Sequence, residues 1–167
     1  MIQKRSNIET LSKENTMNLT ESGDIVQWPE THYVFVEKTG PIPKIAPEAW
    51  QTAISLAPRL AQTNPISWNM SLYKMNPNTY RAGFVVAEKP AELPAGLEYE
   101  LFGGGKYSRF VLTGPYSELP AATSRVFDIV AQRGMMVRGD FCIESYVTDP
   151  RTTPEDKLIT EILIPTA

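Results

Sequence analysis

Two stretches of this 167-residue sequence match each other at a nearly fixed spacing. Segment 24–41 aligns with segment 98–115 at an offset of 74, the difference between Tyr33 and Tyr107. The matched pairs are Trp28 with Phe102, Tyr33 with Tyr107, Thr39-Gly40-Pro41 with Thr113-Gly114-Pro115 and, at an offset of 73, Tyr73 with Tyr146. Identities in the same order at a nearly constant spacing indicate a duplicated structural unit.

Each copy is predicted to form a strand, a helix and a β-hairpin. The strand is rich in β-branched and aromatic residues and ends at Thr-Gly-Pro. In the first copy, Pro47 suits the opening turn of the helix, and apolar residues from Ala49 to Leu60 recur at helical spacing. One such unit leaves a sheet face uncovered, whereas two units can share a core. We therefore predict an α+β fold: two tandem βαββ repeats with pseudo-twofold symmetry, a mostly antiparallel sheet with two main helices on one face, and a concave ligand cleft on the other.

The chain divides by composition into a tail and one domain. Residues 1–23 are polar and poor in aromatic residues, which predicts a mobile tail. The domain covers 24–167, with a first half at 24–87, a linker rich in Pro and Gly at 88–96, and a second half at 97–167. A tail of this length is too short for a helix-turn-helix unit.

Charge and the rarer residues exclude several functions. A net charge of −3 with scattered Lys and Arg argues against nucleic-acid binding. The only cysteine, Cys142, excludes an internal disulfide, and the only histidine, His32, excludes a multi-histidine metal site; we also do not expect Ser-His-Asp or Cys-His catalysis unless a different base serves. We expect no metal and no cofactor. The sequence lacks a run of about 20 apolar residues and a signal peptide, so we expect no membrane partner and a cytoplasmic location.

A single glutamate interrupts an apolar strand near the C-terminus. Segments 141–147 and 158–164 form a predicted β-hairpin around a polar loop with two prolines, and Glu144 lies inside its first strand. The carboxylate either faces water on an edge strand or lies at the floor of a pocket. In a pocket it would attract a cation, and loss of water would raise its pKa, which also suits a general base.

At this point the residues resemble a known family. Segment 98–119, with its Gly-Pro-Tyr before a helix, and segment 142–165, with Glu-x-Tyr, Asp-Pro and Thr-Glu-Ile before a final Pro, are similar to GyrI-like domains. These are the small-molecule effector-binding modules of AraC-type and MerR-type bacterial transcription activators. The resemblance implies two βαββ units around a cleft for hydrophobic, often cationic, molecules. It matches Glu144 to the pocket glutamate and Trp68 to a pocket aromatic residue. Since the DNA-binding domain is missing, we expect a stand-alone form.

The duplication extends the candidate site to both halves. Ser71 is the position equivalent to Glu144 (144 − 73), so the two are expected to flank the axis. Strand alternation puts Tyr146 on the same face as Glu144, and Tyr73 on the same face as Ser71, but it puts Trp68 on the opposite face unless a bulge intervenes. Ordinary core packing is an alternative role for each aromatic residue. The remaining ligand-binding candidates are the equivalent pair Tyr33 and Tyr107, and Tyr116 at the cleft rim.

Three functions are compatible with these residues. The first is a binding protein for small lipophilic or cationic molecules that acts as a sensor or a sequestering module. The second is a hydrolase of electrophilic small molecules, in which Glu144 activates water and Trp68 or Tyr146 assists. The third is a gyrase-inhibitor-like interaction protein with an unknown partner. Binding is the leading hypothesis, and whether the chain is an enzyme is left open.

Overall fold

The computed structural model describes residues 17–166 as one sheet with two helices on it. The strands are β1 (Asn18–Leu19), β2 (Asp24–Trp28), β3 (Thr31–Thr39), β4 (Trp68–Lys74), β5 (Thr79–Val86), β6 (Glu98–Phe102), β7 (Gly105–Thr113), β8 (Cys142–Tyr146) and β9 (Ile159–Ile164). The helices are α2 (Ile42–Ala61) and α3 (Leu119–Gln132), with 3-10 turns η1 (Tyr116–Glu118) and η2 (Glu155–Lys157).

The strands form a single antiparallel sheet whose centre is the junction of the two halves. Their order is β1-β7-β9-β8-β4-β5-β3-β6, and β2 also pairs with β7. The central neighbours are β8 and β4, where Ser71 is paired with Glu144. These residues are 73 positions apart in a duplicated chain, so the pseudo-twofold axis passes through this pair. The predicted α+β class with two βαββ repeats is confirmed.

The two halves exchange their first strands. Strand β2 precedes β3 but pairs with β7, and β6 precedes β7 but pairs with β3. The registers are equivalent: Asp24 pairs with Arg109 and Glu98 pairs with Phe35, and each residue of one pair is 74 positions from its counterpart in the other. Each half therefore contributes a strand to the outer part of the other half.

The β2–β3 and β6–β7 connections meet as a result of this exchange. A Cβ atom at Gly104 would lie 2.1 Å from the Trp28 carbonyl oxygen, and the backbone there has a φ of +70°. Glycine is therefore required at this crossing, both for its conformation and for the close approach of the two backbones.

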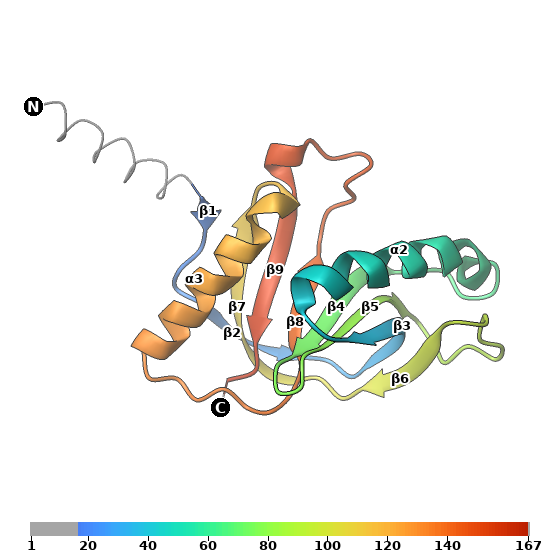
Figure 1. Cartoon of the computed structure of the whole chain (residues 1–167), viewed down its shortest axis with the longest axis horizontal. Helices are drawn as coiled ribbons and strands as arrows, with labels where there is room; N and C mark the ends of the chain where they lie inside the picture. The colour runs from blue at the N-terminus through green and yellow to red at the C-terminus, as the bar shows by residue number, and fades with distance from the viewer. Residues whose placement is uncertain (1–16, 167) are drawn as a thin grey trace, which may run out of the picture.

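Both helices lie on the same face of the sheet, α3 next to β7 and α2 next to β5 and β3, with β8 between them (Figure 1). We call this side, where Tyr73 and Cys142 pack beneath the helices, the helix face. The other side, with Tyr33 and Tyr107, is the far face. Both of these tyrosines have an exposed fraction of 0%, in a second core with Phe102 and Trp28. The predicted concave cleft does not open at these tyrosines, because side chains from the exchanged strands cover them.

The end of the predicted mobile tail is part of the sheet. Strand β1 pairs with the C-terminal end of β7, and Arg133 donates hydrogen bonds to the backbone carbonyls of Glu21 and Ser22. The prediction of a mobile tail is thus wrong for residues 17–23, because their backbone groups find partners on the free edge of β7. Residues 1–16 lie outside the described residues.

Helix α2 begins earlier than predicted. It starts at Ile42, with a proline in its first turn, so Pro47 lies inside the helix instead of opening it. Pro47 and Pro58 each lack the N–H that would bond to the preceding turn. The helix is held to the sheet by Ile45, Ala49, Ala53 and Leu60, which are all buried. No helix within residues 17–166 has the length and apolar character needed to span a membrane, and the cytoplasmic location stays a prediction.

Candidate functional site

Four of the predicted site residues lie together on the helix face of the two central strands. Ser71 and Tyr73 of β4 lie beside Glu144 and Tyr146 of β8, and Ser71 is directly paired with Glu144. This is the placement that the duplication predicted. The expected position on the face away from the helices is wrong, however. Ile143 packs in the far-face core, so alternation turns its neighbour Glu144 towards α2 and α3.

A chain of hydrogen bonds connects the first half to the Glu144 carboxyl group. The Tyr146 hydroxyl donates to Glu144 Oε1 at 2.8 Å. Ser71 Oγ lies 2.8 Å from the Tyr146 hydroxyl oxygen and 2.7 Å from that of Tyr80. The Trp50 indole N–H donates to Ser71 Oγ at 3.1 Å and to the Tyr80 hydroxyl oxygen at 2.9 Å. Because Tyr146 gives its one proton to Glu144, Ser71 donates to Tyr146 and Tyr80 donates to Ser71, so every hydroxyl proton points towards the carboxylate.

Burial and hydrogen bonding act in opposite directions on the Glu144 charge. Loss of water raises the pKa of Glu144 above its ordinary value, and the hydrogen bond from Tyr146 partly offsets this. Burial, followed by the nearby Glu144 charge, raises the pKa of Tyr80 to about 12, so this hydroxyl stays protonated and available as a donor. Within the described residues, no Lys, Arg or His forms an ion pair with Glu144. The carboxylate thus has hydroxyl support but lacks a positive partner.

Aromatic rings from both helical segments stand around Tyr146. The Trp50 ring of α2 meets it edge-on with the ring centroids 5.5 Å apart, and Tyr116 of η1 does the same at 5.6 Å. Trp50 also packs edge-on against Phe84 at 6.1 Å. Edge-to-face contacts at these distances fix the ring orientations. The site is therefore a carboxylate among aromatic walls, with one wall from each half.

Three other predicted residues, Tyr33, Tyr107 and Trp68, lie on the far face, whereas Tyr116 packs against Tyr146 on the helix face. The hydroxyl groups of Tyr33 and Tyr107 donate to the backbone carbonyls of Met70, at 2.7 Å, and Phe141, at 2.8 Å. Both are structural tyrosines in a buried core, where they take no part in the Glu144 site. Trp68 pairs with Val85 of the same core and is 38% exposed. It is thus on the opposite side of the sheet from Glu144, and the structure does not bring together the predicted catalytic pair of Glu144 and Trp68.

Comparison with known protein families decides the identity of the fold. The model of the GyrI-like small molecule binding domain matches residues 23–167. The chain belongs to the GyrI-like family. It is a small-molecule binding domain, as the resemblance of its C-terminal hairpin implied.

Solved structures share the fold of this GyrI-like domain at low sequence identity, and no curated protein matched the sequence. EcmrR in its complex with DNA has a TM-score of 0.72 at 15% identity, covering 98% of this chain and 63% of that chain. The EcmrR C-terminal domain alone has a TM-score of 0.70 at 13% sequence identity, and the match covers 91% of this chain and 98% of that chain. SAV2435 bound to tetraphenylphosphonium has a TM-score of 0.71 at 17% sequence identity, and the match covers 87% of this chain and 94% of that chain. A hydrolase from Listeria innocua has a TM-score of 0.58 at 12% sequence identity, and the match covers 95% of this chain and 98% of that chain. This domain thus spans less than two thirds of the EcmrR chain in the DNA complex.

Sequence reasoning missed three features of this GyrI-like site. Trp50 falls at a core-facing helical position that is typical of packing alone, yet its N–H donates hydrogen bonds to Ser71 and Tyr80. Tyr80 was not singled out, although its place opposite Tyr73 in the β4–β5 hairpin was a usable signal. The Tyr73 hydroxyl is buried without a hydrogen-bond partner among the described residues. An unsatisfied buried hydroxyl is destabilising unless another molecule supplies the bond.

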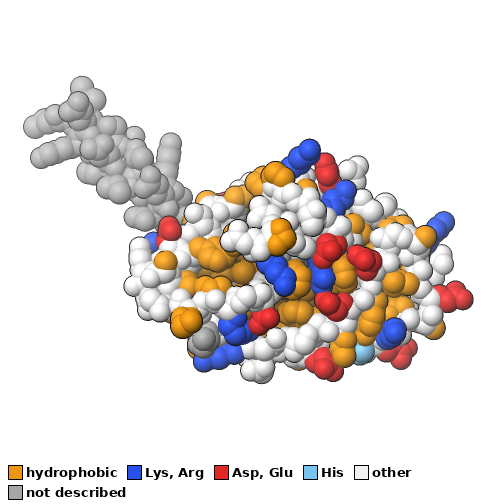
Figure 2. Space-filling view, turned by 60° about the horizontal axis from the view of Figure 1, so that its bottom comes forward, with side chains coloured by type: hydrophobic (Ala, Val, Ile, Leu, Met, Phe, Trp, Pro, Cys, Tyr) orange, Lys and Arg blue, Asp and Glu red, His pale blue; other side chains and the backbone are white. Residues whose placement is uncertain are grey.

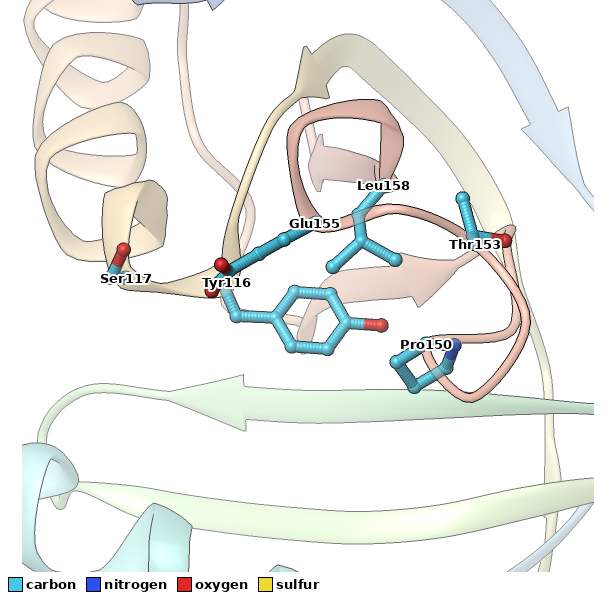
Figure 3. A pocket seen from close by; sticks show the side chains of 6 residues that line it. All are labelled: Tyr116, Ser117, Pro150, Thr153, Glu155 and Leu158. Carbon is cyan, nitrogen blue, oxygen red and sulfur yellow. The ribbon is translucent and has the colours of Figure 1, made fainter.

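One hollow lies beside Tyr116 and another lies at the turn of the β4–β5 hairpin. One, of about 320 Å³, is next to Tyr116 and is also lined by Ser117, Pro150, Thr153, Glu155 and Leu158 (Figure 3). The other, of about 550 Å³, is lined in part by Glu37, Arg81 and Phe141. Figure 2 shows acidic and basic side chains next to one another, with hydrophobic ones between them. Across residues 17–166, no three His, Cys, Asp or Glu side chains are grouped closely enough to hold a metal ion.

Proposed function

We propose that this GyrI-like domain binds a lipophilic cation between α2 and α3, with the Glu144 carboxylate as the charge partner. One observation carries the proposal: the half-buried Glu144 lies beside Tyr146 and the aromatic rings that pack on it, with hydroxyl support and no ion pair within the described chain. A cationic ligand would supply the missing positive charge. Such a domain can act as a sensor or as a sequestering protein.

The surrounding residues favour a cation over an anion or a neutral molecule. All hydroxyl protons of the Tyr80, Ser71 and Tyr146 chain point towards Glu144, which stabilises its negative charge. The faces of Trp50 and Tyr116 can attract a cation through their ring quadrupoles while they remove apolar surface from water. The structural relative SAV2435, which was solved with tetraphenylphosphonium, supports a cation of this type as a probe.

Titration calorimetry with tetraphenylphosphonium tests the proposal. We expect the wild-type domain to bind this cation and Glu144→Gln to bind it about 10-fold to 100-fold more weakly, since the Coulomb attraction between the two charges in a site that partly excludes water contributes about 1.5–3 kcal/mol. Tetraphenylborate has nearly the same shape and the opposite charge, so it should not bind. Thermal unfolding in the presence of tetraphenylphosphonium should give the same ranking, because a ligand of the native state raises Tm.

Glu98→Gln is the matched control, because Glu98 is an exposed glutamate on β6 and its substitution changes the net charge by the same amount. It should leave the affinity unchanged. Equal affinity of wild type and Glu144→Gln, or equal affinity for both tetraphenyl ions, would show that Glu144 is not the charge partner.

Hydrolysis is a second candidate because the raised pKa of Glu144 suits a general base. A structural relative named as a hydrolase gives it additional support. In this version Tyr146, which touches Glu144, replaces Trp68 as the assisting residue. Product analysis with a strained electrophile tests it: turnover that Glu144→Gln eliminates would support a hydrolase, and a rate equal to that of buffer would exclude this substrate class. Inhibition of a protein partner and the absence of nucleic-acid binding stay predictions.

A further inference from the structure

The hollow next to Tyr116 is built from two parts of the second half. Tyr116 and Ser117 come from η1 before α3, and Pro150, Thr153, Glu155 and Leu158 come from the β8–β9 segment (Figure 3). Leu158 is buried and provides an apolar wall, whereas Ser117 and Thr153 offer hydroxyl groups. The ring of Tyr116 points towards Pro150 across the hollow (Figure 3). At about 320 Å³, the space is large enough for a small organic group.

Tyr116 connects this hollow to the Glu144 site. Its ring lines the hollow and also packs edge-on against Tyr146, whose hydroxyl donates to Glu144. Along β8, Glu144 and Tyr146 are two residues apart, which is about 7 Å. A further 5.6 Å separates the ring centroids of Tyr146 and Tyr116. A ligand that follows the rings from Glu144 therefore needs a length of about 12–13 Å to reach the hollow.

The hollow has its own acidic group. Of its six lining residues, Glu155 is the one with a charge. The nearby Asp149 is already neutralised, because Arg151 donates to both of its carboxylate oxygens and lies within 2.9 Å of Oδ2. Glu155 has no ion pair within the described residues. The hollow therefore combines a ring, an apolar wall and an exposed carboxylate without an ion pair among the described residues.

We infer that this hollow is an outer subsite of the Glu144 site, and that the domain prefers elongated dications with one positive end at Glu144 and the other at Glu155. The inference rests on the proposed function and specifies its ligand class. The inner carboxylate contributes more to affinity, because it is half-buried and less screened by water. The outer one is exposed and contributes length selectivity.

Calorimetry with bis(trimethylammonium)alkanes tests the subsite. The series uses short, intermediate and long alkyl spacers, and each dication is compared with the alkyltrimethylammonium monocation of the same chain length. We expect the dication to bind more tightly than its monocation at one range of spacer lengths. Glu155→Gln should weaken that dication about two- to fivefold, the effect of one exposed charge pair, and leave the monocation unchanged. Asp156→Asn is the matched control in the same turn, since it removes the same charge from a residue that does not line the hollow.

The possible results distinguish a failure of the outer Glu155 subsite from a failure of cation binding at Glu144. If monocation binding depends on Glu144 but no spacer favours the dication, or if Glu155→Gln and Asp156→Asn act alike, the outer subsite is wrong and the proposed function stands. If Glu144→Gln leaves monocation binding unchanged, the proposed function itself is wrong. A spacer optimum that Glu155→Gln abolishes supports the subsite.

Discussion

The two halves of the molecule share one fold and one strand register but carry different chemistry at their junction. The first half contributes neutral hydrogen-bonding groups, Trp50, Ser71 and Tyr80, and the second contributes Glu144 and Tyr146. On the axis, Ser71 of one half faces Glu144 of the other. Two glutamates there would place like charges directly opposite each other, which is destabilising. A symmetric scaffold can therefore hold one half-buried carboxylate here only if its halves differ at this position.

The same asymmetry extends to the helix starts. Tyr116 begins η1 in the second half, and the equivalent residue in the first half is Ile42 (116 − 74), at the start of α2. Only the second half therefore carries a ring with a hydroxyl at this corner, beside the hollow of about 320 Å³. The duplication thus explains the shared fold, and the residues that differ between the two copies provide the groups of the candidate binding site.

The largest expected effect is a loss of stability at the crossing of the β2–β3 and β6–β7 connections, where the backbones of the two halves touch. In the first half the crossing segment contains Pro29 and Glu30, and in the second the equivalent residues are Gly103 and Gly104. Gly104→Ala would put a Cβ atom 2.1 Å from the Trp28 carbonyl oxygen and strain a φ of +70°. We expect a loss of about 3–5 kcal/mol in the free energy of unfolding, from backbone strain and overpacking together. Urea unfolding followed by circular dichroism measures it.

Gly103→Ala is the control in the neighbouring position, because a Cβ atom there meets no atom within 4 Å. It should change stability by less than about 1 kcal/mol. If both alanine variants unfold at the same urea concentration as wild type, the close crossing of the two connections does not stabilise the fold.

The second test restores the symmetry of the axis. Ser71→Glu places a carboxylate opposite Glu144 at a position with no exposed surface. We expect a loss of about 2–3 kcal/mol at neutral pH relative to Ser71→Gln, which has the same size without the charge. The loss should shrink in acid, where protonation removes the repulsion. Thermal unfolding of both variants across this pH range measures the difference, and a pH-independent gap would mean that side-chain size, and not charge, excludes glutamate here.

The duplication in the sequence predicted the placement of Ser71 against Glu144, because equivalent positions on two antiparallel strands must meet at a twofold axis. It could not predict that the short strands β2 and β6 are exchanged between the halves, since a strand of that length can pair within its own half or across the axis. The covered far face follows from this exchange, and so does the misplacing of Tyr33 and Tyr107.

Which residues share a face was predictable, but which face the helices cover was not. Alternation grouped Glu144 with Tyr146 and separated Trp68 from them, yet the family resemblance favoured Trp68 as a site residue. Trp50 was missed for a different reason. Its helical position is typical of core packing, and its hydrogen-bond partners lie 21 and 30 residues further along the chain. Long-range polar contacts of this kind leave no local pattern in the sequence.

The smallest predicted effect measures how much stability the domain loses by burying the Glu144 charge when no ligand is bound. Burial raises the pKa of Glu144 in the folded state above the ordinary value of 4.5, so its contribution to stability is fully present below that value and is lost as the pH rises through the raised pKa. Without ligand, Glu144→Gln should therefore be more stable than wild type at neutral pH, by about 1 kcal/mol or about 2–4 °C in Tm. The gap should close below about pH 4.5, where both side chains are neutral, and the exposed Glu98→Gln should show no such gap. A Glu144→Gln variant that is less stable than wild type at neutral pH would mean that the hydrogen bond from Tyr146 outweighs the loss of water, and the carboxylate would then have no need of a cation.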